Sequence, residues 1–293
     1  MSRLSSFIAL STATAAVVLG LSSAALAQAP SPPVLLTSPG ASPKPTAANT
    51  GWQPTGVKLS PSGSLEITSN GTVIDGKDIS GTVTIRASNV TLRRSRVRSG
   101  SYYPVRVISG SNIVIEDVEV DGLGKADKCI VMNGSGVIQR NNIHGCGDGI
   151  APSGSGGITI KDNYVHSPST ASGVHSDGVE MNGGSNMTFS NNNFAYDGAT
   201  TAAVAFSGYY APVSNITFDG NWLAGGAYML HLAGNENPLS NVRITNNRFV
   251  RGSARYGTIY RSGDISKICW EGNVYDDDGA TVSFGGGGTV PCN

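Results

Sequence analysis

Histidines and carboxylates gather in one stretch of the chain, residues 166–180, with the sequence HSPSTASGVHSDGVE. The titratable side chains in it are His166, His175, Asp177 and Glu180. Imidazole titrates near neutral pH, and carboxylates accept protons, donate them or bind metal ions, so these residue types suit proton-transfer chemistry. The same types also cap turns, which is the structural alternative for this stretch.

A repeat along the chain must position these side chains. Apolar residues recur at an anchor position and at two and seven residues after it, and Asn usually stands five residues after the anchor. The anchors lie 22 to 29 residues apart, at Val90, Ile113, Gly136, Ile158, Met187, Ile216, Val242 and Ile268. A second short motif of alternating apolar residues ends in Gly before each anchor after the first. Neither motif is long enough to fold alone, so the copies must pack on one another.

Stacked coils satisfy this pattern. Two period-two strands per repeat, each closed by Gly or Asn, predict an all-β fold, a single-stranded right-handed parallel β-helix (solenoid) of about eight to ten coils. A β-sandwich or propeller is the alternative, but its strands would be spaced more evenly. The charges favour the proposed register. In neighbouring coils, Arg93, Arg94, Arg96 and Arg98 fall opposite Glu116, Asp117, Glu119 and Asp121.

The register also predicts which titratable side chains are neighbours. His144 and His166 share the position eight residues after the anchor, and Asp148 and Asp177 share the position six residues before the Gly. Two adjacent carboxylates repel each other unless a proton or a cation lies between them. We therefore predict one groove that holds all four His residues of the chain.

This groove supplies the candidate site residues. The catalytic candidates are His144, His166, His175, Asp148 and Asp177. The substrate-binding candidates are Tyr164, Glu180, His231, Tyr260 and Arg261. Several titratable groups that converge in one place favour a functional site over turn capping.

The N-terminal residues have the composition of an export signal. Arg3, an apolar run and Ala25-Leu26-Ala27 indicate a cleaved signal peptide over residues 1–27, with an uncleaved anchor as the alternative. Residues 28–50 are rich in Pro, Ser, Ala and Thr and predict a disordered linker. The β-helix domain then covers residues 51–293, and we expect a secreted protein, extracellular or periplasmic, without stable membrane insertion.

Four cysteines in an exported chain predict two disulfides. Cys269 and Cys292 are separated by the length of one coil, and Cys129 and Cys146 would tie neighbouring turns together. The 20 basic and 20 acidic residues give a net charge of +0, which argues against nucleic acid as a partner. We expect the protein to be a monomer.

Several motifs resemble secreted bacterial β-helix proteins of the pectate-lyase-like superfamily. They are Gly51-Trp52-Gln53-Pro54-Thr55-Gly56-Val57, the sequence GTVIDGKDI at residues 71–79, and the later I-H, D-G and H-x-D-G sequences. The resemblance covers nearly all of residues 51–278. It implies activity on polysaccharides, and small secreted members include alginate lyases and other uronate lyases.

For this chain the resemblance implies β-elimination from an acidic polysaccharide. His166 or His175 would be the base, and Tyr164 or another ring hydroxyl would be the acid. Asp148 and Asp177 would hold Ca²⁺ or orient the histidines.

Other activities stay open. Many β-helix lyases use a Lys and Arg pair about one coil apart, whereas Arg140 and Lys161 fit a ladder of charges as well as they fit such a pair. Glycoside hydrolysis by Asp148, Asp177 and Glu180 is the second candidate, and uronate C5 epimerisation is the third. A non-catalytic carbohydrate-binding or adhesive β-helix would need aromatic platforms but no titratable cluster.

Overall fold

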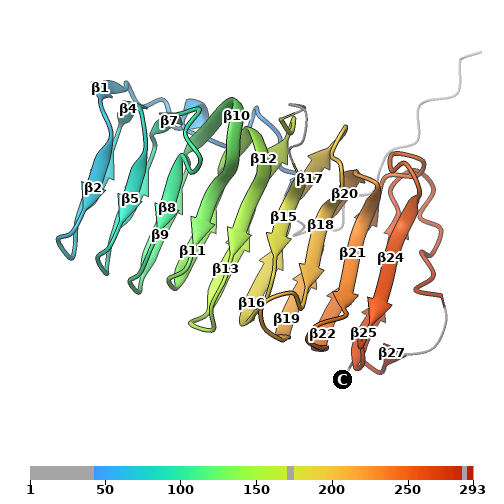
Figure 1. The fold of residues 1–293 in the computed structure, drawn as a ribbon. Coiled ribbons are helices and arrows are strands. Elements are labelled where there is room, and N and C mark those ends of the chain that lie inside the picture. Colours follow the sequence, from blue (N-terminus) through green and yellow to red (C-terminus); the bar gives the residue numbers. More distant parts are fainter. Residues whose placement is uncertain (1–42, 170–174, 286–288, 293) are drawn as a thin grey trace, which may run out of the picture. The chain divides into compact units, whose positions relative to one another are not determined.

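Parallel strands stacked in coils make up almost all of the described chain. The computed structural model describes residues 43–169, 175–285 and 289–292, which form a right-handed parallel β-helix (Figure 1). Each coil places strands on up to three faces, which we call the first, second and third face in chain order. The predicted all-β fold class is confirmed. The predicted signal peptide and residues 28–42 of the predicted linker lie outside the described residues.

The strands of the three faces follow one another along the chain. The first face has β1 (Ser60–Ser62), β4 (Lys77–Ser80), β7 (Arg96–Arg98), β14 (Tyr164–His166), β17 (Asn193–Tyr196), β20 (Trp222–Gly225), β23 (Arg248–Phe249) and β26 (Val274–Tyr275). The second face has β2 (Leu65–Ile67), β5 (Val83–Ile85), β8 (Val105–Val107), β15 (Asp177–Met181), β18 (Ala202–Ser207), β21 (Tyr228–Gly234) and β24 (Gly257–Gly263). Two long strands, β10 (Glu119–Met132) and β12 (Asn142–Pro152), run through both faces and join them into one 17-stranded sheet.

The third face is a separate sheet. Within the described residues it has ten strands, in agreement with the predicted eight to ten coils. They are β3 (Val73–Asp75), β6 (Thr91–Arg93), β9 (Ile113–Glu116), β11 (Gly136–Gln139), β13 (Ile158–Lys161), β16 (Gly184–Ser190), β19 (Val213–Asp219), β22 (Leu239–Thr245), β25 (Ile268–Glu271) and β27 (Thr289–Val290). A single 3-10 turn, η1 (Gln53–Thr55), precedes β1, and no helix among the described residues is long and apolar enough to cross a membrane.

The predicted register of the third face is confirmed. The anchors from Ile113 to Ile268 are successive register partners, through Gly136, Ile158, Met187, Ile216 and Val242. Side chains alternate along each strand, so the anchor and the residue two positions later point into the core. In β13, for example, Ile158 and Ile160 are buried while Lys161 faces outward.

A ladder of buried asparagines follows the third-face strands. Its members are Asn141, Asn163, Asn192, Asn221, Asn247 and Asn273, all without exposed surface. Each side-chain oxygen after the first accepts hydrogen bonds from the backbone N–H and the amide of the preceding member. The positive φ falls one residue before the ladder position, at Asp162 and Asn191 for example, so the ladder Asn is free to point inward.

Charged side chains line up in the predicted register but pair with different partners. Arg93 is the register partner of Glu116, yet its ion pair, at 3.0 Å, is with Asp75 in the preceding coil. Arg140 takes Glu116 as its own partner, at 2.8 Å. Asp75 and Glu116 therefore each pair with an arginine of the following coil, because these long guanidinium side chains reach back toward the N-terminal end.

Residues 43–50 pack against the first face, although we predicted a disordered linker up to residue 50. The amide of Asn193 donates a hydrogen bond of 2.8 Å to the carbonyl of Pro45. Lys44 lies 5.7 Å from the Trp222 ring and 3.7 Å from Asp276. Backbone carbonyls of the Pro-rich segment thus find donors on the solenoid, and the compact unit starts near residue 42.

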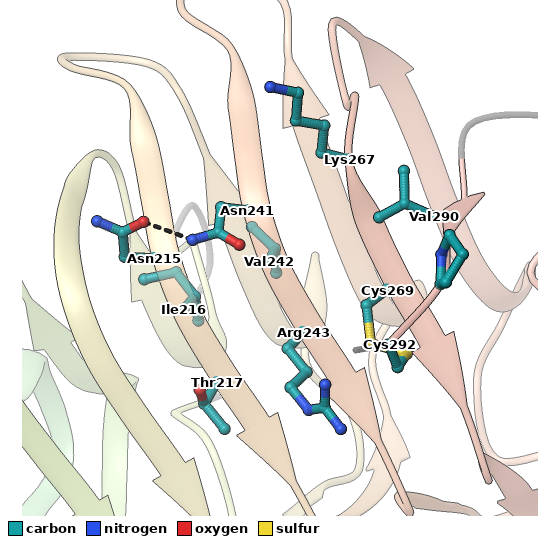
Figure 2. Close-up of a pocket in the computed structure, with 11 residues that line it drawn as sticks. Asn215, Ile216, Thr217, Asn241, Val242, Arg243, Lys267, Cys269, Val290 and Cys292 are labelled. Atoms are coloured by element: carbon teal, nitrogen blue, oxygen red, sulfur yellow. Dashed lines mark hydrogen bonds between the residues drawn. A yellow bond between two sulfur atoms is a disulfide. The ribbon is translucent and has the colours of Figure 1, made fainter.

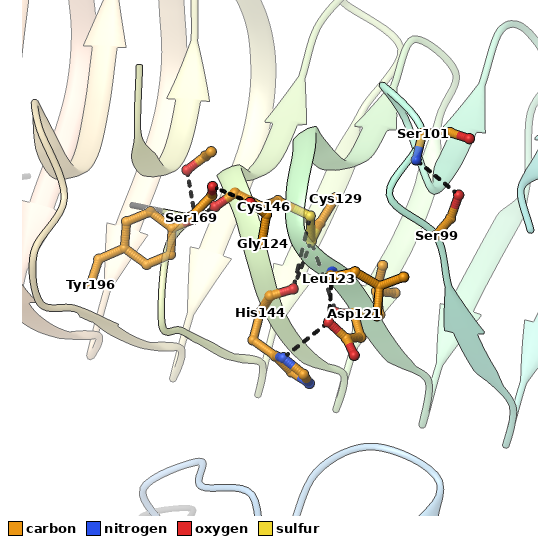
Figure 3. The surroundings of a disulfide bond; sticks show 12 residues. Ser99, Ser101, Asp121, Leu123, Gly124, Cys129, His144, Cys146, Ser169 and Tyr196 are labelled. Atoms are coloured by element: carbon orange, nitrogen blue, oxygen red, sulfur yellow. Dashed lines mark hydrogen bonds and ion pairs between the residues drawn. A yellow bond between two sulfur atoms is a disulfide. The ribbon is translucent and has the colours of Figure 1, made fainter. Parts of the chain in front are cut away.

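Both predicted disulfides are present. Cys129–Cys146 joins β10 to β12, with His144 beside Asp121 close to the bridge (Figure 3). Cys269–Cys292 joins β25 to the C-terminal residues. The first bridge lies between adjacent coils and therefore fixes the part of β10 and β12 from which the candidate site is built.

Candidate active site

The candidate residues divide between two faces of the β-helix. His144 and His166 are register partners on the first face, with ring centroids 5.1 Å apart, as predicted. His175 stands two residues before β15, and His231 lies in β21, so both belong to the second face. The prediction of one groove with all four histidines is therefore wrong, because the two faces of a coil direct their outward side chains differently.

The first-face histidine His166 has partners on both ring nitrogens. Its Nε2 lies 2.8 Å from Asn142 Oδ1, and its Nδ1 lies 2.8 Å from Ser167 Oγ. The ring stacks on Tyr164 at 4.1 Å. Burial, followed by the nearby charge of His144, lowers the pKa of His166 to about 4. A neutral ring held on both nitrogens is a structural group, not an available base.

The other first-face groups hold the N-terminal segment. Trp52 Nε1 and Gln53 Nε2 donate hydrogen bonds of 2.9 and 3.0 Å to Glu119 Oε2. His144 Nε2 lies 3.5 Å from the same carboxylate, and this interaction lowers the pKa of Glu119. The position of His144 is thus explained by attachment of the chain that precedes β1.

Five side chains form a compact group on the second face, which we call the second-face cluster: Lys128, Asp148, His175, Asp177 and Glu180. His175 Nδ1 lies 3.2 Å from Asp177 Oδ2, 3.8 Å from Asp148 Oδ1 and 3.7 Å from Glu180 Oε1. The backbone N–H of Asp177 donates to Asp148 Oδ1 at 2.9 Å. Lys128 Nζ donates to both Asp148 Oδ2 and Glu180 Oε2.

The two aspartates of the cluster are buried side by side, on adjacent coils as the register predicts. Only 1% of the Asp148 side chain and 0% of the Asp177 side chain is exposed. Burial raises the pKa of both carboxyls, and the charge of Asp148 helps to raise that of Asp177 well above its usual value. Asp148 accepts hydrogen bonds from the Asp177 backbone N–H and from Lys128, whereas burial and the charge of Asp148 favour the protonated form of Asp177, so we assign the proton of this pair to Asp177.

His175 carries a positive charge at neutral pH. Its interaction with Asp148 outweighs burial and, with the other acidic side chains, raises the pKa of His175 to about 9. Its Nε2 lies 2.8 Å from Thr201 Oγ1. Both ring nitrogens therefore face acceptors, as expected for an imidazolium.

Lys128 and Glu180 hold each other in their charged forms. Burial lowers the pKa of Lys128, but the carboxylates of Asp148 and Glu180 outweigh it, and the pKa rises above its usual value. Burial likewise raises the pKa of Glu180, but the hydrogen bond from Lys128 brings it below its usual value.

His231 has the opposite electrostatic environment. It follows Glu180 and Ala205 in one outward column and precedes Tyr260, as predicted. Burial, followed by the charge of His175, lowers the pKa of His231 below its usual 6.5. Its imidazole is therefore neutral at neutral pH.

A groove in two sections runs over the cluster and crosses the second-face strands. One section has a volume of about 710 Å³ and extends from Arg106 past Lys128, and the other, of about 290 Å³, extends to His231. The sections share Glu180, Asn182 and Tyr210. From β8 to β21 the groove crosses five strand spacings, or about 24 Å. A chain molecule laid along the solenoid axis fits this length.

Three predicted substrate-binding residues lie outside the groove. Tyr164 belongs to the first face. Tyr260 contacts the His231 ring at 4.5 Å but does not line either section. Arg261 is the register partner of the buried Leu232 and stacks on Phe284 at 4.7 Å, so it belongs to the C-terminal end of the core.

Sequence reasoning missed Lys128 and Arg106. Lys128 stands six residues before Gly134, which is the position of Asp148 and Asp177 in their own repeats, and it is the register partner of Asp148. Aligning the Gly-terminated motif of the preceding coil in the same way identifies Lys128 as a neighbour of Asp148. Arg106 lies 5.1 Å from the Tyr103 ring at the far end of the groove, and no sequence motif identifies it.

The cluster is a poor fit for the Ca²⁺ that the resemblance implies. Asp148, His175 and Asp177 bring one ligand atom each within 4.8 Å of one another. Ca²⁺ takes six to eight oxygen ligands, whereas this set includes a ring nitrogen. The ammonium of Lys128 also lies between Asp148 and Glu180, where it repels a divalent cation.

A separate groove of about 450 Å³ lies on the third face beside the Cys269–Cys292 disulfide (Figure 2). Arg243 and Lys267 line it from β22 and the residue before β25. It contains none of the predicted site residues, so the second-face groove is the better candidate for chemistry.

Comparison with known proteins gives one match. A family described as "Right handed beta helix region" matches residues 49–175 and 128–290. No curated protein and no solved structure matches the chain. The matched residues include the whole second-face groove.

Proposed function

Because the chain belongs to the right-handed β-helix family, we propose that it is a secreted lyase that cleaves a uronate-containing polysaccharide by β-elimination. The β-helix fold is consistent with proteins that bind or act on polysaccharides. Two disulfides fit an oxidising compartment outside the cytoplasm.

One observation carries the proposal: two histidines in different protonation states line the same groove section. His231 is neutral and His175 is cationic at neutral pH. A site with two titratable groups whose pKa values are pushed apart has an acid and a base ready at one pH. Lys128 and Arg106 add positive charge to the groove, which favours an anionic polymer.

The elimination then proceeds with defined roles. His231 accepts the C5 proton of a uronate, the C4–O bond breaks, and a C4=C5 double bond forms. His175 supplies the proton that the leaving oxygen takes up. The Thr201 hydroxyl, hydrogen bonded to His175 Nε2 and also lining the groove, offers the path for that proton.

This assignment changes the base and the acid expected from the sequence. His166 and Tyr164 lie on the first face, and both nitrogens of His166 are hydrogen bonded. His175, the other candidate base, lies beside the carboxylates of Asp148 and Glu180, which keep it protonated. His231 takes the role of base because burial and a neighbouring cation favour its neutral form.

Hydrolysis is the second candidate. The protonated Asp177 beside Asp148 is the observation that favours it, since a glycosidase needs one carboxylic acid and one carboxylate. It ranks lower because both side chains are fully buried, although Asp177 lines the smaller groove section.

The test is a panel of polymers. Alginate, pectate, glucuronan and hyaluronan are incubated with the protein, and ultraviolet absorbance and reducing ends are recorded together. Elimination predicts that both signals rise with at least one polymer, because only elimination makes an unsaturated sugar. Reducing ends without absorbance would indicate hydrolysis, and neither signal would favour a binding protein.

A further inference from the structure

The second-face cluster holds an ammonium group where converging carboxylates would otherwise need a cation. Lys128 Nζ reaches from β10 across to Asp148 in β12 and Glu180 in β15. An ammonium has three N–H donors, and these two carboxylates take two of them. Asp127 Oδ2 lies 3.9 Å from Nζ, too far for a hydrogen bond. The Lys128 side chain is 20% exposed and lines the groove, so the remaining N–H can reach a bound molecule.

We propose that Lys128 is the catalytic cation of this groove, which binds the substrate carboxylate and thereby makes the C5 proton acidic without a divalent metal. The inference rests on the proposed elimination and names the group that makes it possible. Removing a proton next to a carboxylate is difficult because negative charge accumulates there, and a fixed positive charge stabilises it.

The charges of the cluster are balanced without a metal ion. Lys128 and His175 are positive, Glu180 and Asp148 are negative, and Asp177 holds a proton. A divalent cation bound at Asp148 would stand next to both the ammonium and the imidazolium. Like charges at such short distances repel strongly in a partly buried site.

The three reacting groups follow one another along the groove. Lys128 contacts Glu180 in β15, His175 is bonded to Thr201 directly before β18, and His231 lies in β21. β15 and β21 are two strand spacings apart, or about 10 Å. The group that would bind the carboxylate and the two groups that would exchange protons with the sugar therefore lie along one short stretch of the groove.

The test combines two measurements on the full chain. The rate of elimination is measured before and after EDTA treatment, for the wild type, Lys128→Met and Lys128→Arg. Lys125→Met is the matched control, since Lys125 is exposed in the same strand β10. Calorimetric titration with CaCl₂ alone is carried out on the wild type and Asp148→Asn.

We expect the wild-type rate to be unchanged by EDTA and the wild type to take up no Ca²⁺. Lys128→Met should lower the rate by about 10²-fold, the loss typical for removal of one charge-stabilising donor. Lys128→Arg should keep more of the wild-type rate than Lys128→Met, because it keeps the positive charge. Lys125→Met should stay near the wild-type rate.

The inference is overturned if EDTA abolishes elimination and CaCl₂ restores it, if Ca²⁺ uptake by the wild type is lost in Asp148→Asn, or if Lys128→Met keeps its activity. The wild-type measurements decide the matter even if Lys128→Met does not fold. Elimination that depends on Ca²⁺ would refute the role of Lys128 alone, whereas no elimination of any polymer would refute the proposed function as well.

Discussion

Individual pKa values in the groove are set by which charges surround each ring. His175 has three carboxylate oxygens within 3.8 Å of its Nδ1, and its positive form is stabilised. His231 is half-buried in the same groove section as His175, so its positive form is opposed by burial and by a like charge. The two imidazoles thus reach opposite protonation states although they belong to one residue type.

These opposite shifts predict a bell-shaped pH profile. The base His231 must be neutral, so kcat/KM should fall as the pH drops through its pKa, below 6.5. The acid His175 must be protonated, so kcat/KM should also fall as the pH rises through about 9. Steady-state rates on the active polymer across this range check the prediction. A rate that keeps increasing above pH 9 would argue that His175 is not the acid.

The interaction with Asp148 is the largest cause of the raised pKa of His175. Asp148→Asn should therefore lower the pKa of His175 toward 6.5, and the alkaline side of the pH profile should move with it. NMR titration of the His175 ring protons measures the change. Asp121→Asn is the control, since Asp121 lies 3.7 Å from His144 on the other face and should leave His175 unchanged.

At the scale of strands, the repeat predicts much of the fold, because each coil makes the same contacts with its immediate neighbours. Alternating side chains fix which residues enter the core, and a buried Asn at one position pairs with its copies in neighbouring coils. The repeat also places Asp148 beside Asp177, since both stand at one position before a Gly.

Sequence reasoning fails where a contact depends on the direction of a face or on the length of a side chain. The register correctly pairs His166 with His144 and Asp177 with Asp148. The sequence does not show that these two pairs lie on different faces of the β-helix, because it does not give the angle between the faces. The partner of Arg93 likewise depends on how far a long side chain extends, and register alone favours Glu116 over Asp75. Arg106 lies two coils before Asp148 and still lines the groove. The spacing of residues in the sequence does not predict this position.

The asparagine ladder predicts a stability effect. Asn163→Ala removes the acceptor of the Asn141 backbone N–H and the donor to the Ile138 carbonyl, both buried. Loss of such partners should lower the free energy of unfolding by about 3 kcal/mol. Urea denaturation measures it, with the exposed Asn235→Ala as control. Equal stability of the two variants would mean that the ladder contributes little.

Considered as a whole, the β-helix is stabilised coil by coil. Each coil packs only on its neighbours, so the site, which draws residues from six second-face strands, depends on the coils keeping their spacing. The Cys129–Cys146 bridge joins the two coils that supply Lys128 and Asp148. At the C-terminal end, Phe284 and Val282 cover the core beside Trp270.

Removing the first bridge should weaken both stability and activity. The double variant Cys129→Ala/Cys146→Ala opens a loop of 17 residues, which corresponds to about 3 kcal/mol of unfolding free energy. Elimination should decrease while the strands persist, because Lys128 and Asp148 flank the bridge. Urea denaturation and the activity assay check this. The variant Cys269→Ala/Cys292→Ala, at the C-terminal end, should lose stability but keep the activity of the remaining folded protein.

The measurement that tests the central claim most directly is the rate of unsaturated product formation by His231→Ala and His166→Ala on the polymer that the wild type cleaves. The second-face groove predicts that His231→Ala loses about 10²-fold or more, the usual contribution of a general base, and that His166→Ala stays close to the wild type. A loss in His166→Ala with full activity in His231→Ala would contradict the account and move the site to the first face.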